Sequence, residues 1–120
     1  MMDANSKLEY SAELSVVRFL SRHKIPTRVV CQGSYTQKTG RQIMKCFSIC
    51  NDKYYIYFQG RYINNPTKPG KISAFSSIVL VDWSTGHPKE LEHQHIDTIE
   101  DINHFLGALL NYIDKEEDND

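Results

Sequence analysis

From Thr27 to Trp83, one β-prone segment follows another, and no helical pattern interrupts them. Within this stretch Ile78–Val81 is apolar at every position, which is typical of a central strand buried on both faces. Strands that follow one another directly pair antiparallel, whereas parallel strands need a long crossover between them. The sequence therefore predicts an antiparallel sheet.

Two amphipathic helical patterns flank these strands, at Lys7–Lys24 and at Thr98–Asp114, because apolar residues recur there at three- and four-residue spacing. Ser6 and Glu9 match a capping box for the first helix, and Pro26 stops it. The fold class that follows is α+β, with the order α-β-β-β-β-(β)-α and both helices packed against a sheet of four to five strands.

The expected strands are bounded by turn residues and alternate between two faces. On the second strand Ile43, Phe47 and Ile49 should share a face. On the third, Tyr54, Ile56 and Phe58 should share one face, and Tyr55, Tyr57, Gln59 and Arg61 the other. The strands are Thr27–Tyr35, Gln42–Cys50, Lys53–Gln59, Ile72–Trp83 and a weaker fifth strand at Lys89–His95, with a two-residue turn at Asn51 and Asp52.

Length and composition fit one soluble globular domain. The chain has 120 residues, of which 40% are hydrophobic and 24% charged. We expect a single domain over residues 1–114 and a frayed acidic tail over 115–120. No apolar run is long enough to span a membrane. The chain has only three cysteines, an odd number that does not suit a disulfide scaffold, so we expect a cytoplasmic protein.

The net charge of −1 conceals a strong polarity along the chain. Residues 1–81 hold twelve Lys/Arg and four Asp/Glu, which gives +8, and residues 82–120 hold two Lys/Arg and eleven Asp/Glu, which gives −9. Helices that pack side by side would let some of these charges pair, whereas separate helices would leave two faces of opposite sign.

Few residues suggest catalysis, and we expect no cofactor. His93 and His95 would share one face of a strand, but they are weak metal candidates without further ligands, so we expect no metal site. Cys46 and Cys50 lie too far apart along a strand to share a zinc ion, and we expect them to behave as small apolar side chains.

The opening order of one helix and three strands loosely resembles the restriction-endonuclease-like core. Gln59-Gly60-Arg61 stands where that family has an acid-x-lysine element, and Gln42 stands where a carboxylate should precede it. The resemblance implies a degenerate or active nuclease, for which Glu9, Glu13 and Asp82 are the remaining acids.

A second alternative is a nucleic-acid-binding domain that stacks bases on aromatic side chains and neutralises phosphates with cations. The opposing interpretation is that these aromatic residues pack under a helix. The residues concerned are Tyr55, Tyr57, Arg61, Lys68 and Lys71.

Our leading hypothesis is a non-enzymatic protein-binding module of the inhibitor, immunity or anti-defence type, whose partner presents a basic surface. An uncovered sheet face would also permit a homodimer. The expected contact residues are the acids of the last third of the chain: Glu90, Glu92, Glu100, Asp101, Asp114, Glu116, Glu117 and Asp118.

Overall fold

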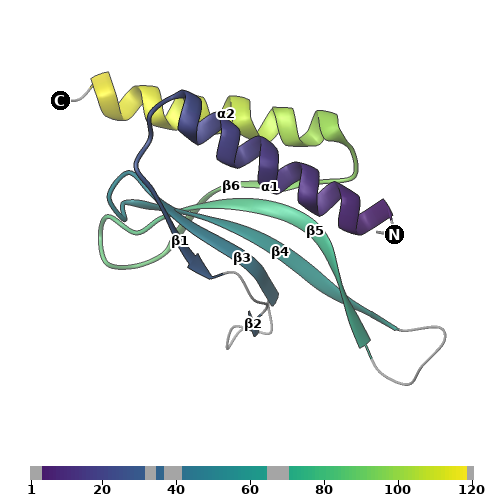
Figure 1. Ribbon diagram of the computed structural model, residues 1–120. Coiled ribbons are helices and arrows are strands. Elements are labelled where there is room, and N and C mark those ends of the chain that lie inside the picture. The colour runs from purple at the N-terminus through teal and green to yellow at the C-terminus, as the bar shows by residue number, and fades with distance from the viewer. Residues whose placement is uncertain (1–3, 32–34, 37–41, 65–70, 119–120) are drawn as a thin grey trace.

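A computed structural model describes the backbone of residues 4–31, 35–36, 42–64 and 71–118, and the side chains of residues 4–31, 42–60 and 74–114. The element order confirms the predicted α+β class (Figure 1). The elements are α1 (Ala4–Arg22), β1 (Thr27–Cys31), β2 (Tyr35–Thr36), β3 (Gln42–Ile49), β4 (Tyr54–Asn64), β5 (Lys71–Asp82), β6 (Lys89–His95) and α2 (Ile99–Asp118).

All strands belong to one antiparallel sheet in the order β1-β3-β4-β5-β6, and the short β2 also pairs with β3. The longest strands, β4 and β5, therefore lie near the middle. The weaker predicted strand is confirmed as β6, with the predicted bounds, at one edge of the sheet.

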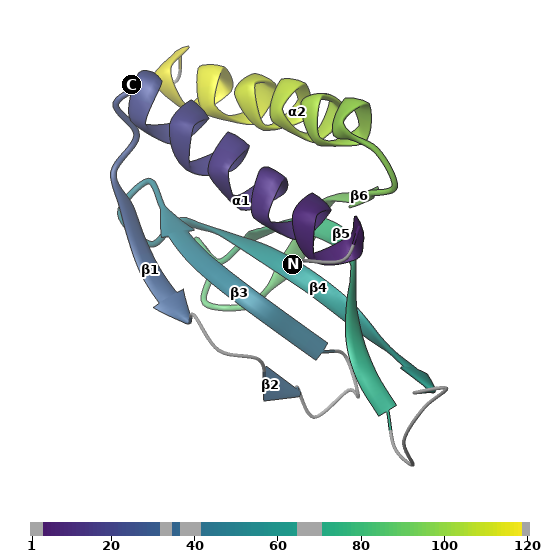
Figure 2. The same cartoon turned by 45° about the vertical axis from the view of Figure 1, so that its right-hand side comes forward.

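Both helices lie side by side on one face of the sheet and run in the same direction (Figures 1 and 2). Neither described helix covers the other face, which we call the helix-free face. Neither of them carries an apolar stretch long enough to cross a membrane.

The main core lies between the helices and the sheet. Phe58 on β4 is fully buried there, and its ring packs against Phe47 and Phe75, with both centroid distances 5.8 Å. Tyr54 and Ile56 join the same cluster, so the predicted facing of the third strand is confirmed.

A second apolar cluster lies on the helix-free face. It contains Val79, Val81 and Tyr57, which alternate with core residues on the same strands. Ile78–Val81 is therefore buried on both faces, as predicted. The indole Nε1 of Trp83 donates to the Tyr57 hydroxyl at 3.2 Å.

The prediction that Ile43 shares a face with Phe47 and Ile49 is wrong. The β3–β4 register shifts between Ile43 and Lys45, so one extra residue changes the facing of the strand. Ile43 belongs to the cluster on the helix-free face, while Phe47 and Ile49 belong to the main core.

The predicted start of the first helix is also wrong, because α1 begins at Ala4 and Ser6 lies within its first turn. A tertiary contact fixes this start. The Asn5 side chain exchanges two hydrogen bonds with the backbone of Phe75, at 2.9 and 3.0 Å. At the other end α1 stops two residues before the predicted Lys24, whose φ of 56° is not helical.

Three strand or helix bounds differ from the prediction for conformational reasons. The β3–β4 turn includes Cys50 besides Asn51 and Asp52, since all three have positive φ. The expected Thr27–Tyr35 strand divides into β1 and β2, and α2 continues four residues beyond Asp114. Residues 37–41 and 65–70 lie outside the described residues.

We expect Phe58→Ala to lower the free energy of unfolding by about 3–5 kcal/mol, because it removes a buried ring from the centre of the core. Tyr10, whose side chain is exposed, provides the control: Tyr10→Ala should change stability by less than about 0.5 kcal/mol. Urea denaturation measures both. Equal effects would contradict this placement of the core.

Candidate functional site

The flank formed by β6 and α2 carries most of the acidic side chains that the structure describes. β6 is an edge strand, and α2 packs on it through Tyr112, whose hydroxyl lies 3.3 Å from the backbone oxygen of Leu91 and 3.2 Å from the Glu92 carboxylate. We call this surface the acidic flank; its described acids are Glu90, Glu92, Asp97, Glu100, Asp101 and Asp114.

Several of the predicted contact acids already have partners within the fold. Glu90 pairs with His93 Nδ1 at 2.8 Å, and Glu92 with Tyr112. Glu100 and Asp114 are exposed and form no ion pair within the described part of the chain. Glu116, Glu117 and Asp118 lie on the last turn of α2, and their side chains are outside the description.

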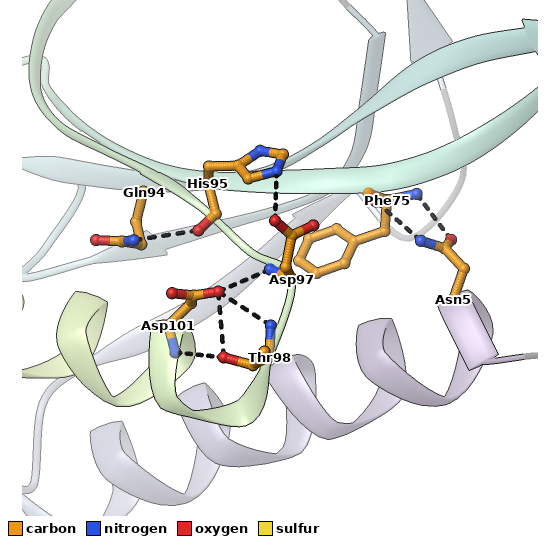
Figure 3. A network of polar contacts seen from close by, with 7 residues as sticks. All are labelled: Asn5, Phe75, Gln94, His95, Asp97, Thr98 and Asp101. Carbon is orange, nitrogen blue, oxygen red and sulfur yellow. Dashed lines mark hydrogen bonds and ion pairs between the residues drawn. The ribbon is translucent and has the colours of Figure 1, made fainter.

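Asp101 has a structural task at the start of α2 (Figure 3). Its carboxylate accepts hydrogen bonds from the backbone amides of Asp97 and Thr98, at 2.8 and 3.0 Å, and the Thr98 hydroxyl closes the cap. These bonds, first those from the Asp97 and Thr98 amides, lower the pKa of Asp101.

The exposed face of α2 forms a polar ridge at helical spacing. Glu100 and Asp114 lie at its ends, Asn103 and Asn111 lie between them, and Gly107 is in the middle. We call these five residues the α2 ridge. Glycine in the middle of a helix costs about 0.5–1 kcal/mol relative to alanine.

Nothing in the described fold requires glycine at position 107. A Cβ atom added there would meet no atom within 4 Å, and the backbone is helical. The α2 ridge therefore has no side chain at its centre and an acidic side chain at each end. Another surface can approach the centre of the ridge closely.

A cleft of about 490 Å³ opens where the first turns of both helices meet β5 and β6. His95 and Asp97 stand at its wall and pair with each other at 3.0 Å (Figure 3). Both side chains are well exposed, at 60% and 73%.

The register places His93 opposite Val79, on the helix-free side of β6, and His95 opposite Ser77 at the end of the strand, where it also lines the cleft. Each pairs with its own carboxylate, Glu90 or Asp97. No group of three His, Cys, Asp or Glu side chains that could hold a metal ion occurs among the described residues.

The aromatic residues of the nucleic-acid alternative lie on the helix-free face and not under a helix. Tyr57 is buried, with 7% exposed, and bonded to Trp83, so its ring is not available for stacking on a base. Tyr55 is half-buried and packs against Tyr57 and Trp83, with centroid distances of 6.3 and 5.8 Å.

The cations of that alternative lie on a projecting hairpin. β4 and β5 pair as far as Asn64 and Lys71, whereas β3 reaches only to the level of Gly60. We call the part beyond this level, Arg61–Asn64 with Lys71–Ala74, the β4–β5 arm (Figure 1). Arg61 and Lys71 are on it, and Lys68 lies in the loop outside the described residues.

The acids of the nuclease alternative form ion pairs or hydrogen bonds within the fold. Lys45 of β3 bonds the Glu13 carboxylate and lies 3.9 Å from that of Glu9. Burial raises the pKa of Glu9, and the charge of Lys45 opposes this effect. Asp82 accepts a hydrogen bond from the Ser84 amide at 2.7 Å, which lowers its pKa together with the Ser84 hydroxyl. Gln59 bonds Ser77.

The helices lie side by side, but their exposed charges are not paired. Arg18, Arg22 and Lys24 are exposed at the end of α1 and form no ion pair within the described residues. Opposite charges thus remain available to solvent on neighbouring helices.

Sequence reasoning missed Gly107 and the β4–β5 arm. A glycine inside a clear helical pattern was the signal for the first. For the second, β-prone residues continue past Gln59 to Ile63 and have counterparts at Ile72 and Ala74. No protein-family model matches the chain, and no curated protein and no solved structure matches it.

Because the folded pKa of Asp101 lies below its unfolded value of about 3.9, its stabilisation is complete above that pH and is lost as the pH falls through the folded pKa. We expect Asp101→Ala to destabilise the protein at pH 7 and to flatten the decline of stability that begins as the pH falls below about 4. Glu100→Gln, the neighbouring exposed acid, is the control. Denaturation at several pH values measures the free energy of unfolding of each variant. If this free energy fell with pH as steeply in the Asp101 variant as in the wild type, the capping role of Asp101 would be refuted.

Proposed function

We propose that this chain is a non-enzymatic, cytoplasmic protein-binding module whose α2 ridge and acidic flank dock onto a basic surface of a partner. The observation that carries the proposal is Gly107. This residue weakens the helix, nothing in the described fold needs it, and it lies at the centre of an exposed ridge. A glycine at this position is explained if the backbone or a large side chain of a partner packs directly against α2 there.

The chemistry of the ridge supports a protein partner with cations. Glu100 and Asp114 are exposed at its two ends, about four turns of helix apart as they are 14 residues apart. Asn103 and Asn111 add hydrogen-bonding groups between them. Complementary charge accelerates encounter and rejects wrong partners, which suits an inhibitor, immunity or anti-defence protein.

The nuclease alternative has the least support. Glu9 and Glu13 both face Lys45, and Asp82 caps a turn, so these acids do not gather around one point where a metal ion would bind.

The ridge is tested with two substitutions at Gly107. Gly107→Ala should raise the free energy of unfolding by about 0.5–1 kcal/mol, because alanine restricts the unfolded chain. Gly107→Met should leave the fold intact but weaken binding to a partner recovered with the tagged chain from its host. Ser21→Met, at an exposed position of α1, is the matched control. Calorimetric titration measures binding.

The charges are tested in the same titration. Glu100→Gln with Asp114→Asn should raise the dissociation constant about threefold at low salt, and the difference should shrink as salt screens it. Ser21→Lys with Thr85→Lys changes the net charge equally at exposed sites elsewhere. Full binding by Gly107→Met, or equal loss in the charge control, would reject the ridge as the docking surface.

A nucleic-acid function is the second candidate, and the β4–β5 arm favours it. A two-stranded ribbon fits the major groove of DNA, and this one carries Arg61 and Lys71. The aromatic surface contributes less than expected, since Tyr57 is buried.

For this candidate, we expect a gel-shift titration to show affinity for duplex DNA that falls steeply with salt. Arg61→Glu with Lys71→Glu should abolish the shift, while Lys24→Glu with Arg22→Glu, at exposed positions near the end of α1, should retain most of it. Absence of any shift at low salt would eliminate the candidate.

A further inference from the structure

Cys31 and Cys46 face each other across two strands. In the β1–β3 pair they are direct Cα partners, immediately after the register shift that follows Val29. Both belong to the cluster on the helix-free face, so their side chains point to the same side of the sheet. All three cysteines of the chain are thiols in this structure.

Opposed residues in antiparallel strands have Cα atoms about 4.5–5.5 Å apart. A disulfide requires a Cα separation of about 4.4–6.8 Å, and both side chains on one face. Cys31 and Cys46 are Cα partners and share a face, which is the placement that a cross-strand disulfide needs. Cys50 does not have this placement, because it lies in the turn after β3 and packs against the main core on the other side.

The two thiols differ in access. Cys46 is 1% exposed, and burial raises its pKa to about 12, so it does not react first with a reagent in solution. Cys31 is half-buried on the edge strand, where a small reagent reaches it. A more accessible attacking thiol next to a buried resolving thiol is the arrangement of a redox pair.

We propose that Cys31 and Cys46 are such a pair and that a low-molecular-weight disulfide of the glutathione class oxidises them to a cross-strand disulfide. The Cys31 thiolate attacks one sulfur of the reagent, whose S–S bond breaks and releases one thiolate. Cys46 then loses its proton, and its sulfur attacks Cys31 and expels the second thiolate. Two cysteine thiols are oxidised, and one reagent disulfide is reduced to two thiols that take up the two protons.

The bond would fix an edge strand that only β3 holds. β1 pairs with no other strand among the described residues, and Val29 and Val30 are exposed on it, at 47% and 42%. Oxidation would therefore slow the opening of β1 and leave the rest of the sheet unchanged.

The test treats the full chain with glutathione disulfide. In denaturant, the number of reactive thiols should fall from three to one, and peptide mapping should join the Cys31 peptide to the Cys46 peptide. Cys50→Ser should form the same bond, and Cys46→Ser should instead accumulate glutathione on Cys31. Amide hydrogen exchange in β1 should slow after oxidation and recover after reduction.

Two results would overturn the proposal. One is stable glutathione on Cys31 of the wild type at a yield equal to that of Cys46→Ser. The other is a disulfide that includes Cys50. Neither result affects the α2 ridge, so this proposal and the proposed function fail independently.

Discussion

The pairing of β4 with β5 is the interaction on which the rest of the structure depends. The paired residues extend from Tyr54 and Asp82 to Asn64 and Lys71, with one register shift between Gln59 and Gly60. On one side of this ladder Phe58 and Phe75 bring the main core together, and on the other Tyr57 and Val79 form the second cluster. Every other strand, and both helices, are placed relative to it.

The sequence predicted the fold well where one physical signal dominated. The uninterrupted strands predicted an antiparallel sheet, and the helical spacing predicted both helices, because burial of an amphipathic stripe leaves few alternatives. The facing of Tyr54, Ile56 and Phe58 followed from alternation alone.

The errors arose where a distant contact decided the outcome. The bulge beside Ile43 depends on the partner strand, and the start of α1 depends on Phe75, which is 70 residues from Asn5. Two side-chain roles differ in how far the sequence indicates them. Thr98 and Asp101 have the three-residue spacing of a capping box, so that cap was open to local prediction, whereas nothing local indicates that Lys45 pairs with Glu9 and Glu13. The sequence therefore predicted that the proposed docking surface is acidic. It did not predict which of its acids are exposed and which form contacts within the fold.

The parallel helices also determine the order in which this molecule can be completed. α1 precedes every described strand in the chain and α2 follows them all, yet the two helices lie beside each other over the same sheet face. Until α2 is made, β6 has no helix packed on that face. A nascent chain with an open apolar sheet face is prone to wrong association. Among the described elements α2 therefore covers this face last in chain order, and its exposed polar residues replace an apolar surface with a polar one.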